Sequence, residues 1–209
     1  MTPRVRLVKP SLRWLAPFVT AVRRSGRLHA RWVAPPSTPA AYRAYLDRLR
    51  RPAHAGYLVC LAGSRELVGV VNISEIVRSS FQSGYLGYYA FEPHARQGLM
   101  AEGLSLVVDD AFRRLGLHRL EANIQPSNAR SLRLVRRLGF QREGYSPRYL
   151  RVAGVWRDHE RWAILADGHR RQQSRTPARR WRPTPAVTQM DGRSIGHGRK
   201  ASRASRRNR

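Results

Sequence analysis

The apolar positions of the chain follow two different periods, one typical of helices and one typical of strands. Five apolar residues within the segment 99–115 are spaced i, i+3, i+4, i+7 and i+11, which places them on one face of a helix. These residues are Leu104, Val107, Val108, Ala111 and Leu115. Runs rich in β-branched and aromatic residues lie on both sides of this segment and are typical of strands. The order of segments predicts a mixed α/β domain of the α+β type, with several hairpins.

Capping residues and glycines set the expected boundaries of these elements. Thr38 followed by Pro39 is typical of a helix start, because the Thr side chain accepts a hydrogen bond from the first turn and the N–H that Pro lacks is not used there. Gly116 and Gly139 are typical of helix ends. The predicted helices span residues 11–24, 38–50, 99–115 and 128–138. The predicted strands span residues 4–8, 56–62, 67–77, 85–91, 118–124, 140–149 and 155–165.

The composition changes after residue 167. Residues 170–209 hold 13 Lys and Arg against one acid, Asp191, and their scattered apolar residues show no period. Such a segment cannot bury enough apolar surface to offset its chain entropy. We therefore predict one domain over residues 1–167 and a disordered Arg-rich tail over residues 168–209. The whole chain has 40 Lys and Arg, 13 Asp and Glu and a formal net charge of +27, which favours an anionic partner.

Several classes of protein and site do not fit the sequence. The single cysteine, Cys60, cannot form an internal disulfide, which fits a reducing cytoplasm. No apolar run reaches the roughly 18 residues that span a bilayer, so we expect neither membrane insertion nor secretion. His159 alternates with Asp158 and Glu160 along a predicted strand, and side chains on opposite faces cannot share one coordination sphere. We therefore expect no metal.

Two segments have the residue types of a binding site. Residues 92–103 run from a strand through a basic loop into a helix, where free N–H groups and Gly98 form a suitable cradle for a pyrophosphate. A glycine at such a junction also has a purely structural interpretation. In the second segment Asn128 is a natural helix cap and Ser131 lies one turn later, so both residues have a structural interpretation as well.

Taken together and in this order, the segments resemble the GCN5-related N-acetyltransferase (GNAT) superfamily. The resemblance is carried by Tyr88-Tyr89, Arg96-Gln97-Gly98-Leu99-Met100-Ala101-Glu102, Asn128-x-x-Ser131 and Leu138-Gly139-Phe140. Within the superfamily the chain is most similar to the ribosomal-protein-alanine N-acetyltransferases, and the resemblance covers about residues 4–165. The motifs of that narrower group are Gly98-Leu99-Met100, Asn123, Pro126-x-Asn128, Arg137-Leu138-Gly139-Phe140, Glu143-Gly144-Tyr145 and Trp156-Arg157-Asp158-His159.

The resemblance implies a single GNAT-like domain whose mixed, mostly antiparallel sheet is splayed between its fourth and fifth strands, with acetyl-CoA bound in the splay as co-substrate. It implies that backbone groups of the fourth strand and of the loop hold the coenzyme, and that one helix-capping amide holds its pantetheine arm. The residues assigned in this way are Tyr89, Ala90, Phe91, Arg96, Gln97, Gly98, Leu99, Met100, Ala101 and Asn128. The loop departs from the usual family pattern at Ala95 and Met100, although backbone donors need no particular side chain.

Direct acetyl transfer needs a neutral amine, a polarised carbonyl and a protonated leaving thiolate. The resemblance implies that Ser131 is the general acid. A backbone N–H between Tyr89 and Phe91 is the expected oxyanion donor, because fixed dipoles need no reorganisation. If the side chains of the strand alternate, Glu121 faces the splay and is the candidate general base. The alternative is that Glu121 is an exposed strand residue or the ion-pair partner of an arginine.

We therefore expect an acetyl-CoA-dependent N-acetyltransferase that acts through a ternary complex on the N-terminal α-amino group of a protein, plausibly a ribosomal protein. An α-amine with a pKa of about 8 is partly neutral at physiological pH, whereas a lysine amine with a pKa of about 10.4 is almost entirely charged, so the α-amine depends less on a general base. The basic tail would contact RNA or the ribosome, or would only solubilise the chain. Two alternatives are a catalytically weak nucleic-acid-binding protein on the same fold and an acetyltransferase for small amines.

Overall fold

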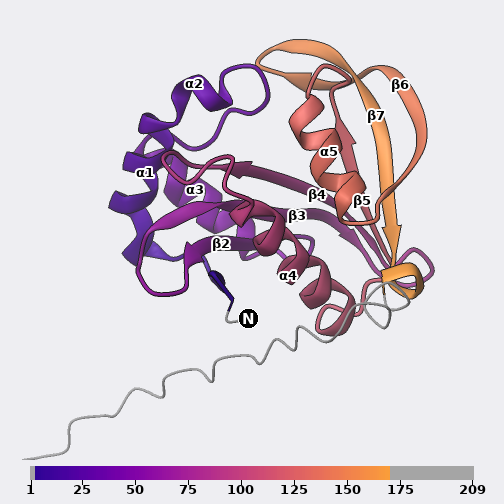
Figure 1. Cartoon of the computed structure of the whole chain (residues 1–209), viewed down its shortest axis with the longest axis horizontal. Helices are drawn as coiled ribbons and strands as arrows, with labels where there is room; N and C mark the ends of the chain where they lie inside the picture. Colours follow the sequence, from indigo (N-terminus) through magenta and orange to yellow (C-terminus); the bar gives the residue numbers. More distant parts are fainter. Residues whose placement is uncertain (1–2, 170–209) are drawn as a thin grey trace, which may run out of the picture. The chain divides into compact units, whose positions relative to one another are not determined.

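The computed structural model describes residues 3–169, and the tail predicted from residue 168 lies outside the described residues except for its first two positions. A seven-stranded sheet with the order β1-β2-β3-β4-β5-β7-β6 forms the centre of the domain (Figure 1). The strands are β1 (Val5–Val8), β2 (Ala55–Leu61), β3 (Leu67–Val77), β4 (Ser83–Ala90), β5 (Arg119–Ile124), β6 (Gln141–Val152) and β7 (Val155–Leu165). All neighbouring strands are antiparallel except β4 and β5, which are parallel.

The helices begin and end where capping chemistry predicts. Thr38 Oγ1 accepts a hydrogen bond from the N–H of Ala41 at 3.2 Å, and Gly116 and Gly139 adopt positive φ angles of 66° and 88° after helices. The helical elements are η1 (Leu12–Trp14), α1 (Leu15–Arg24), α2 (Gly26–His29), α3 (Pro39–Leu49), α4 (Leu99–Arg113) and α5 (Ala129–Arg137). The short helix α2 is absent from the sequence prediction, because four residues do not show a period.

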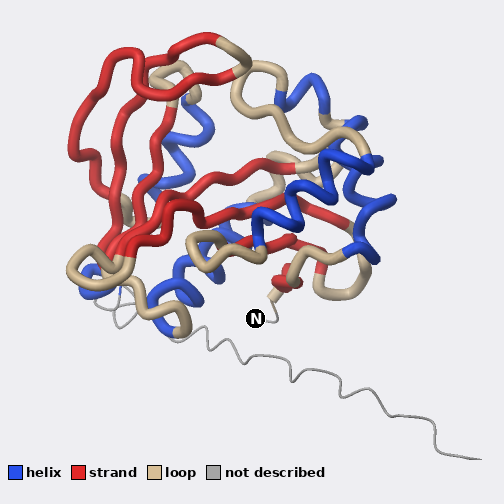
Figure 2. Tube along the Cα trace, turned by 180° about the vertical axis from the view of Figure 1, so that it is seen from behind, coloured by secondary structure: helices blue, strands red, loops and turns tan. Residues whose placement is uncertain are grey.

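Two apolar clusters hold the helices on opposite faces of the sheet. The helices α4 and α5 pack on one face, through residues such as Leu104 and Val135, which are fully buried. The helices α1 and α3 pack on the other face, where the rings of Phe18 and Tyr42 pack at an interplanar angle of 42° with centroids 4.5 Å apart. Figures 1 and 2 show these layers from the two sides of the sheet. The three-layer arrangement buries both faces of the central strands.

The sheet opens between β4 and β5. These two strands pair only over Ser83–Tyr85 and Arg119–Glu121, and beyond this stretch β5, β6 and β7 turn away from β2, β3 and β4 (Figure 1). The last five residues of β4 therefore have a partner strand on one side only. The mixed α/β fold and the splay that the resemblance implied are both confirmed.

The predicted strands and long helices agree with the structure within a few residues at their ends. The largest difference is β6, which continues to Val152 because its ladder with β7 resumes after an irregular stretch between Ser146 and Leu150. Helical residues also follow β7 up to His169, whose ring packs against Phe112 and bonds to Asp109. Among residues 3–169 no helix combines the length and the apolar character required to cross a membrane.

Candidate active site

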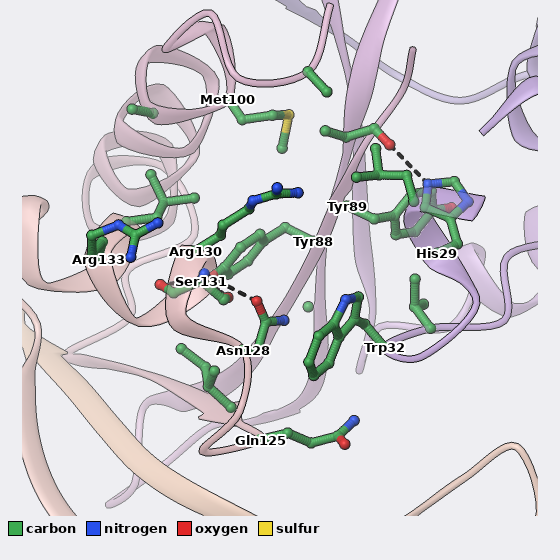
Figure 3. Close-up of a pocket in the computed structure, with 18 of the residues that line it drawn as sticks. His29, Trp32, Tyr88, Tyr89, Met100, Gln125, Asn128, Arg130, Ser131 and Arg133 are labelled. Atoms are coloured by element: carbon green, nitrogen blue, oxygen red, sulfur yellow. Dashed lines mark hydrogen bonds between the residues drawn. The ribbon is translucent and has the colours of Figure 1, made fainter. Parts of the chain in front are cut away.

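A cavity of about 840 Å³ occupies the opening between β4 and β5. Its walls come from β4, the end of β5, the loop before α4, the helix α5 and the segment from α2 to residue 33 (Figure 3). Eight of the twelve site residues predicted from the sequence line it: Tyr89, Ala90, Arg96, Gly98, Met100, Ala101, Asn128 and Ser131. Segments that are far apart in the sequence therefore meet where the sheet splays.

The loop before α4 presents unused backbone donors to the cavity. Gly98 is the N-cap of α4 and has a φ of 78°, a conformation that only glycine adopts without strain. A Cβ at this position would meet only the Arg4 guanidinium, at 3.4 Å, so backbone conformation and not crowding requires the glycine. In the described part of the chain no acceptor bonds the N–H of Gly98, Leu99 or Met100. The structural and functional interpretations of this glycine are thus compatible.

Two side chains in the first turn of α4, Met100 and Glu102, contact neighbouring elements. Arg4 Nε donates to Glu102 Oε1 at 2.7 Å and thereby fixes the first turn of α4 to the start of the chain. Met100, which replaces a smaller residue of the family pattern, packs over Gly69 of β3, where a Cβ would collide with the Met100 sulfur. The room that Met100 needs is therefore supplied by a glycine on the neighbouring strand.

Three residues that were expected to bind the coenzyme have side chains that lie elsewhere. Phe91 is fully buried against Phe18, and its N–H donates to Val68 O at 2.7 Å. Leu99 belongs to the core, and Gln97 Nε2 donates to the carbonyl of Pro93. Leu99 can contribute only its free backbone N–H, and the N–H of Phe91 is not available as an oxyanion donor.

Alternation along β4 identifies the backbone groups that face the opening. Because the N–H of Phe91 points to β3, the N–H of Tyr89, two residues earlier, also points to β3. The N–H groups of Tyr88 and Ala90 therefore face the cavity. The carbonyl of Ala90 accepts a hydrogen bond from His29 Nε2 at 2.8 Å, which holds the end of the strand in place (Figure 3).

The first turn of α5 carries the two polar residues that the sequence singled out. Asn128 Oδ1 accepts the N–H of Ser131 at 3.2 Å, so Asn128 caps the helix as its structural interpretation predicts. The same bond leaves the amide nitrogen of Asn128 directed away from α5 and into the cavity (Figure 3). The Asn128 side chain can therefore both cap α5 and offer a donor to a ligand in the cavity.

Ser131 is hydrogen-bonded across the cavity to Tyr88. The Ser131 Oγ and the Tyr88 hydroxyl are 2.5 Å apart, and either oxygen can donate (Figure 3). Burial raises the pKa of Tyr88 to about 12, against a smaller opposing effect of the bond to Ser131. The phenol is therefore protonated at neutral pH and can supply a proton to the Ser131 hydroxyl. Tyr88 was quoted among the family motifs, but only the register of β4 shows that it faces α5.

Glu121 is not brought into the cavity. Its carboxylate accepts from Arg119 Nε at 2.8 Å, and the same guanidinium also binds Glu143. Glu121 pairs with Tyr85 in the stretch where β4 and β5 are still hydrogen-bonded, at the closed end of the splay. The structure favours the ion-pair interpretation of Glu121 over the role of general base, because the carboxylate is hydrogen-bonded to Arg119 and does not line the cavity.

The cavity is basic. Four arginines line it, Arg96, Arg130, Arg133 and Arg137, and none of its described lining residues is Asp or Glu. No group of His, Cys, Asp and Glu within residues 3–169 is arranged to hold a metal ion. The lining also includes Trp32 and His159, to which the sequence prediction gave no role. Trp32 lies in a loop without periodicity, where no sequence signal was available.

Comparison with known proteins agrees with this geometry. Residues 4–141 match the sequence pattern of the family described as "Acetyltransferase (GNAT) domain". The chain is 36% identical over 121 residues to the "Probable N-acetyltransferase YjcK" of Bacillus subtilis, a match that covers 58% of this chain and 67% of that protein. It is 44% identical over 95 residues to the "[Ribosomal protein uS5]-alanine N-acetyltransferase" of Escherichia coli, which covers 46% of this chain and 49% of that enzyme.

Solved structures share the fold. Mycobacterium smegmatis RimJ in complex with CoA-disulfide superposes with a TM-score of 0.72 at 24% identity, over 82% of this chain and 88% of that chain. Spermidine N-acetyltransferase from Vibrio cholerae, in complex with CoA and spermine, superposes with a TM-score of 0.69 at 18% identity, over 80% and 99% of the two chains. The chain belongs to the GNAT acetyltransferase family and is an N-acetyltransferase.

Proposed function

We propose that the protein transfers the acetyl group of acetyl-CoA to the α-amino group at the N-terminus of a protein, and that the acceptor is a ribosomal protein. The observation that carries this proposal is the charge of the cavity, which has four arginines and no carboxylate among its described lining residues. Such a cavity suits a polyanionic coenzyme and a weakly charged acceptor.

The residues present fit acetyl-CoA, the co-substrate that GNAT acetyltransferases use. The free N–H groups of Gly98, Leu99 and Met100 at the start of α4 suit a pyrophosphate, and Arg96 adds a positive charge beside them. The backbone edge of β4 at Tyr88 and the Asn128 amide suit the pantetheine arm. When bound there, the coenzyme supplies the thioester and the leaving thiolate.

The chain's own groups meet the two electrostatic demands of acetyl transfer. The outward N–H groups of Tyr88 and Ala90 are fixed dipoles that stabilise negative charge on a carbonyl oxygen in the gap. Ser131 donates its hydroxyl proton to the leaving sulfur, and Tyr88 returns a proton to Ser131 through their hydrogen bond. A Tyr–Ser pair can do this without an ionised acid, since both hydroxyls are neutral at physiological pH.

A protein N-terminus suits this cavity better than a polyamine does. Spermidine carries several positive charges and would approach four arginines, with no acidic side chain among the lining residues that the structure describes. An α-amino group has a pKa of about 8, so an appreciable fraction is already neutral at pH 7.5. The 44% identity to the E. coli enzyme that acetylates the alanine of ribosomal protein uS5 supports the same class of acceptor.

A peptide screen tests the proposal. The purified full chain is incubated with acetyl-CoA and synthetic peptides that reproduce the N-termini of ribosomal proteins, and mass spectrometry locates the acetyl group. We expect α-amino acetylation, fastest for peptides that begin with alanine, and no reaction of matched peptides whose N-terminus is already blocked. Faster acetylation of spermidine than of every peptide, or transfer only to lysine side chains, would contradict the proposal.

A further inference from the structure

Three histidines line the cavity and differ in how their ring nitrogens are bonded. His29 bonds Ala90 O through Nε2, which holds the end of β4, and its other nitrogen is buried without a partner. His94 lies in the loop at the coenzyme end of the cavity and pairs with Glu66 at 2.9 Å. His159 on β7 is different, because its free nitrogen has no partner within the described chain and is not enclosed by protein.

The tautomer of His159 follows from its one hydrogen bond. Nδ1 lies 2.9 Å from the carbonyl oxygen of Arg157, which can only accept, so Nδ1 carries the proton. Nε2 is then a bare lone pair on a side chain that lines the cavity. The side chain is only 3% exposed, and the ring of Tyr149 lies 6.3 Å away by centroid, so the imidazole is held in one orientation.

A second free acceptor lies on the same face of the sheet. Asn123 lines the cavity, and its Oδ1 is buried without a hydrogen-bond partner, which is costly unless a ligand donates to it. Asn123 pairs with Arg161 on β7, and His159 lies two residues from Arg161, so the Asn123 and His159 side chains share a face. Two acceptor atoms without donors therefore belong to cavity-lining side chains on one face of β5 and β7.

We propose that this part of the cavity is the acceptor-amine subsite, in which Asn123 Oδ1 holds the incoming ammonium group and His159 Nε2 removes its proton; this rests on the acetyl transfer proposed above. The ammonium carries three protons and the product amide keeps one. One proton passes to His159 Nε2 and then to solvent, which frees the nitrogen lone pair for the new C–N bond. The other replaces the proton that passes from Tyr88 through Ser131 to the departing sulfur, so both hydroxyls are neutral again at the end of the reaction.

The surroundings of His159 suit a base that is neutral at physiological pH. Burial lowers its pKa below 6.5, and this exceeds the opposing effects of the Arg157 carbonyl and the Asp158 carboxylate. Asp158 accepts hydrogen bonds from the Tyr145 hydroxyl and from the N–H of Arg148 on β6, which hold its carboxylate against β6. Tyr149 faces the ring from β6, Arg161 lies on the same face of β7, and Arg130, Arg133 and Arg137 of α5 line the same cavity.

The pH dependence of one variant tests the subsite. We compare kcat/KM of the full chain and of His159→Gln for a short peptide that begins with alanine, between pH 6 and pH 9. With the base present, the enzyme uses the ammonium form, so activity persists at pH 6. The variant uses only amine that is already neutral, so we expect a loss of about 100-fold at pH 6 that shrinks to a few-fold at pH 9. A deficit of the same size at every pH would overturn the assignment.

Matched variants separate chemistry from folding. His118→Gln changes an exposed histidine at the start of β5, and we expect a wild-type pH profile. Asn123→Ala removes the amide and with it the proposed acceptor for the ammonium, so we expect about a tenfold higher KM for the peptide, with kcat changed by less than threefold. An unchanged KM would remove Asn123 from the subsite. Calorimetric titration with CoA is expected to give wild-type affinity for all three variants.

A second measurement does not depend on turnover. The ring proton of His159, assigned in the NMR spectrum by its loss in His159→Gln, is followed in the CoA-saturated protein as the alanine peptide is added. A shift of this signal together with a titration midpoint below 6.5 supports the subsite, even where no transfer is seen and the proposed function itself fails. A signal whose chemical shift does not change when the peptide is added would overturn the subsite assignment and would leave the proposed acetyl transfer unaffected.

Discussion

The two walls of the cavity present different kinds of chemical groups. The wall formed by β4 and the loop before α4 presents backbone groups, chiefly the N–H of Ala90 and of Gly98 through Met100. The wall formed by β5, α5 and β7 presents side chains, namely Asn123, Ser131 and His159. The proposed function therefore assigns coenzyme binding mainly to backbone groups of the first wall and proton transfer to a few side chains of the second.

Removal of the proposed general acid, Ser131, is expected to have the largest effect and to distinguish the roles of the two walls most clearly. Ser131→Ala deletes the hydroxyl that bonds Tyr88 but keeps the helix N-cap, since the cap uses the backbone N–H of residue 131. We expect kcat to fall by about 100-fold or more, because general acid catalysis contributes on this scale, with CoA affinity unchanged. Rapid-mixing kinetics at saturating acetyl-CoA measure the first quantity and calorimetry the second. An unchanged kcat would remove Ser131 from the mechanism.

Distortion of the backbone wall should have the opposite signature. Gly98→Val places a β-branched residue at a φ of 78°, which costs about 1–3 kcal/mol and displaces the N–H groups at the start of α4. We expect CoA to bind about 10- to 100-fold more weakly, by the conversion of that energy into a binding constant. Gly63→Ala is the control, since residue 63 is an open hairpin position with nothing within 4 Å of a Cβ. Normal CoA affinity of Gly98→Val would refute the phosphate loop.

The bond between the two walls can be tested separately. Tyr88→Phe removes the hydroxyl that holds Ser131 while it keeps the packed ring. We expect kcat to fall about tenfold, less than for Ser131→Ala, because the Ser131 hydroxyl remains but loses its proton source. In a double-mutant cycle the second substitution should add almost nothing to the first. Fully additive effects would show that Tyr88 and Ser131 act independently.

Glu121→Gln is expected to have the smallest effect. The carboxylate lies outside the cavity lining and pairs with Arg119, so its loss removes one partly exposed ion pair. We expect kcat/KM for the alanine peptide to change by less than about threefold at every pH, since such pairs contribute little. A large loss that grows toward low pH would instead restore Glu121 as the base and would count against His159.

The contrast between the walls also explains what the sequence could predict. The helix caps Thr38 and Asn128 and the glycine at residue 98 are local features, so their conformations follow from a few neighbouring residues, and the structure agrees. The splay between β4 and β5 followed from the resemblance to a family and not from any local pattern.

The side-chain wall was harder to predict, because its members come from separate strands. Glu121 has the right alternation, but its pairing with Arg119 depends on which charges meet in three dimensions. His159 was considered as a metal ligand and rejected, because it alternates with Asp158 and Glu160 along a strand. Its free nitrogen depends on a bond to the Arg157 carbonyl, which the sequence does not show. Local periodicity carries no information on such contacts.

The central claim is that the gap between β4 and β5 holds acetyl-CoA on free backbone N–H groups. Amide hydrogen exchange of the full chain, followed residue by residue with and without acetyl-CoA, tests it most directly. The account predicts slower exchange on addition of the coenzyme at Tyr88, Ala90, Gly98, Leu99 and Met100, with little change at Tyr89 and Phe91, whose N–H groups face β3. Unaltered exchange at the first five amides under saturating coenzyme would contradict it.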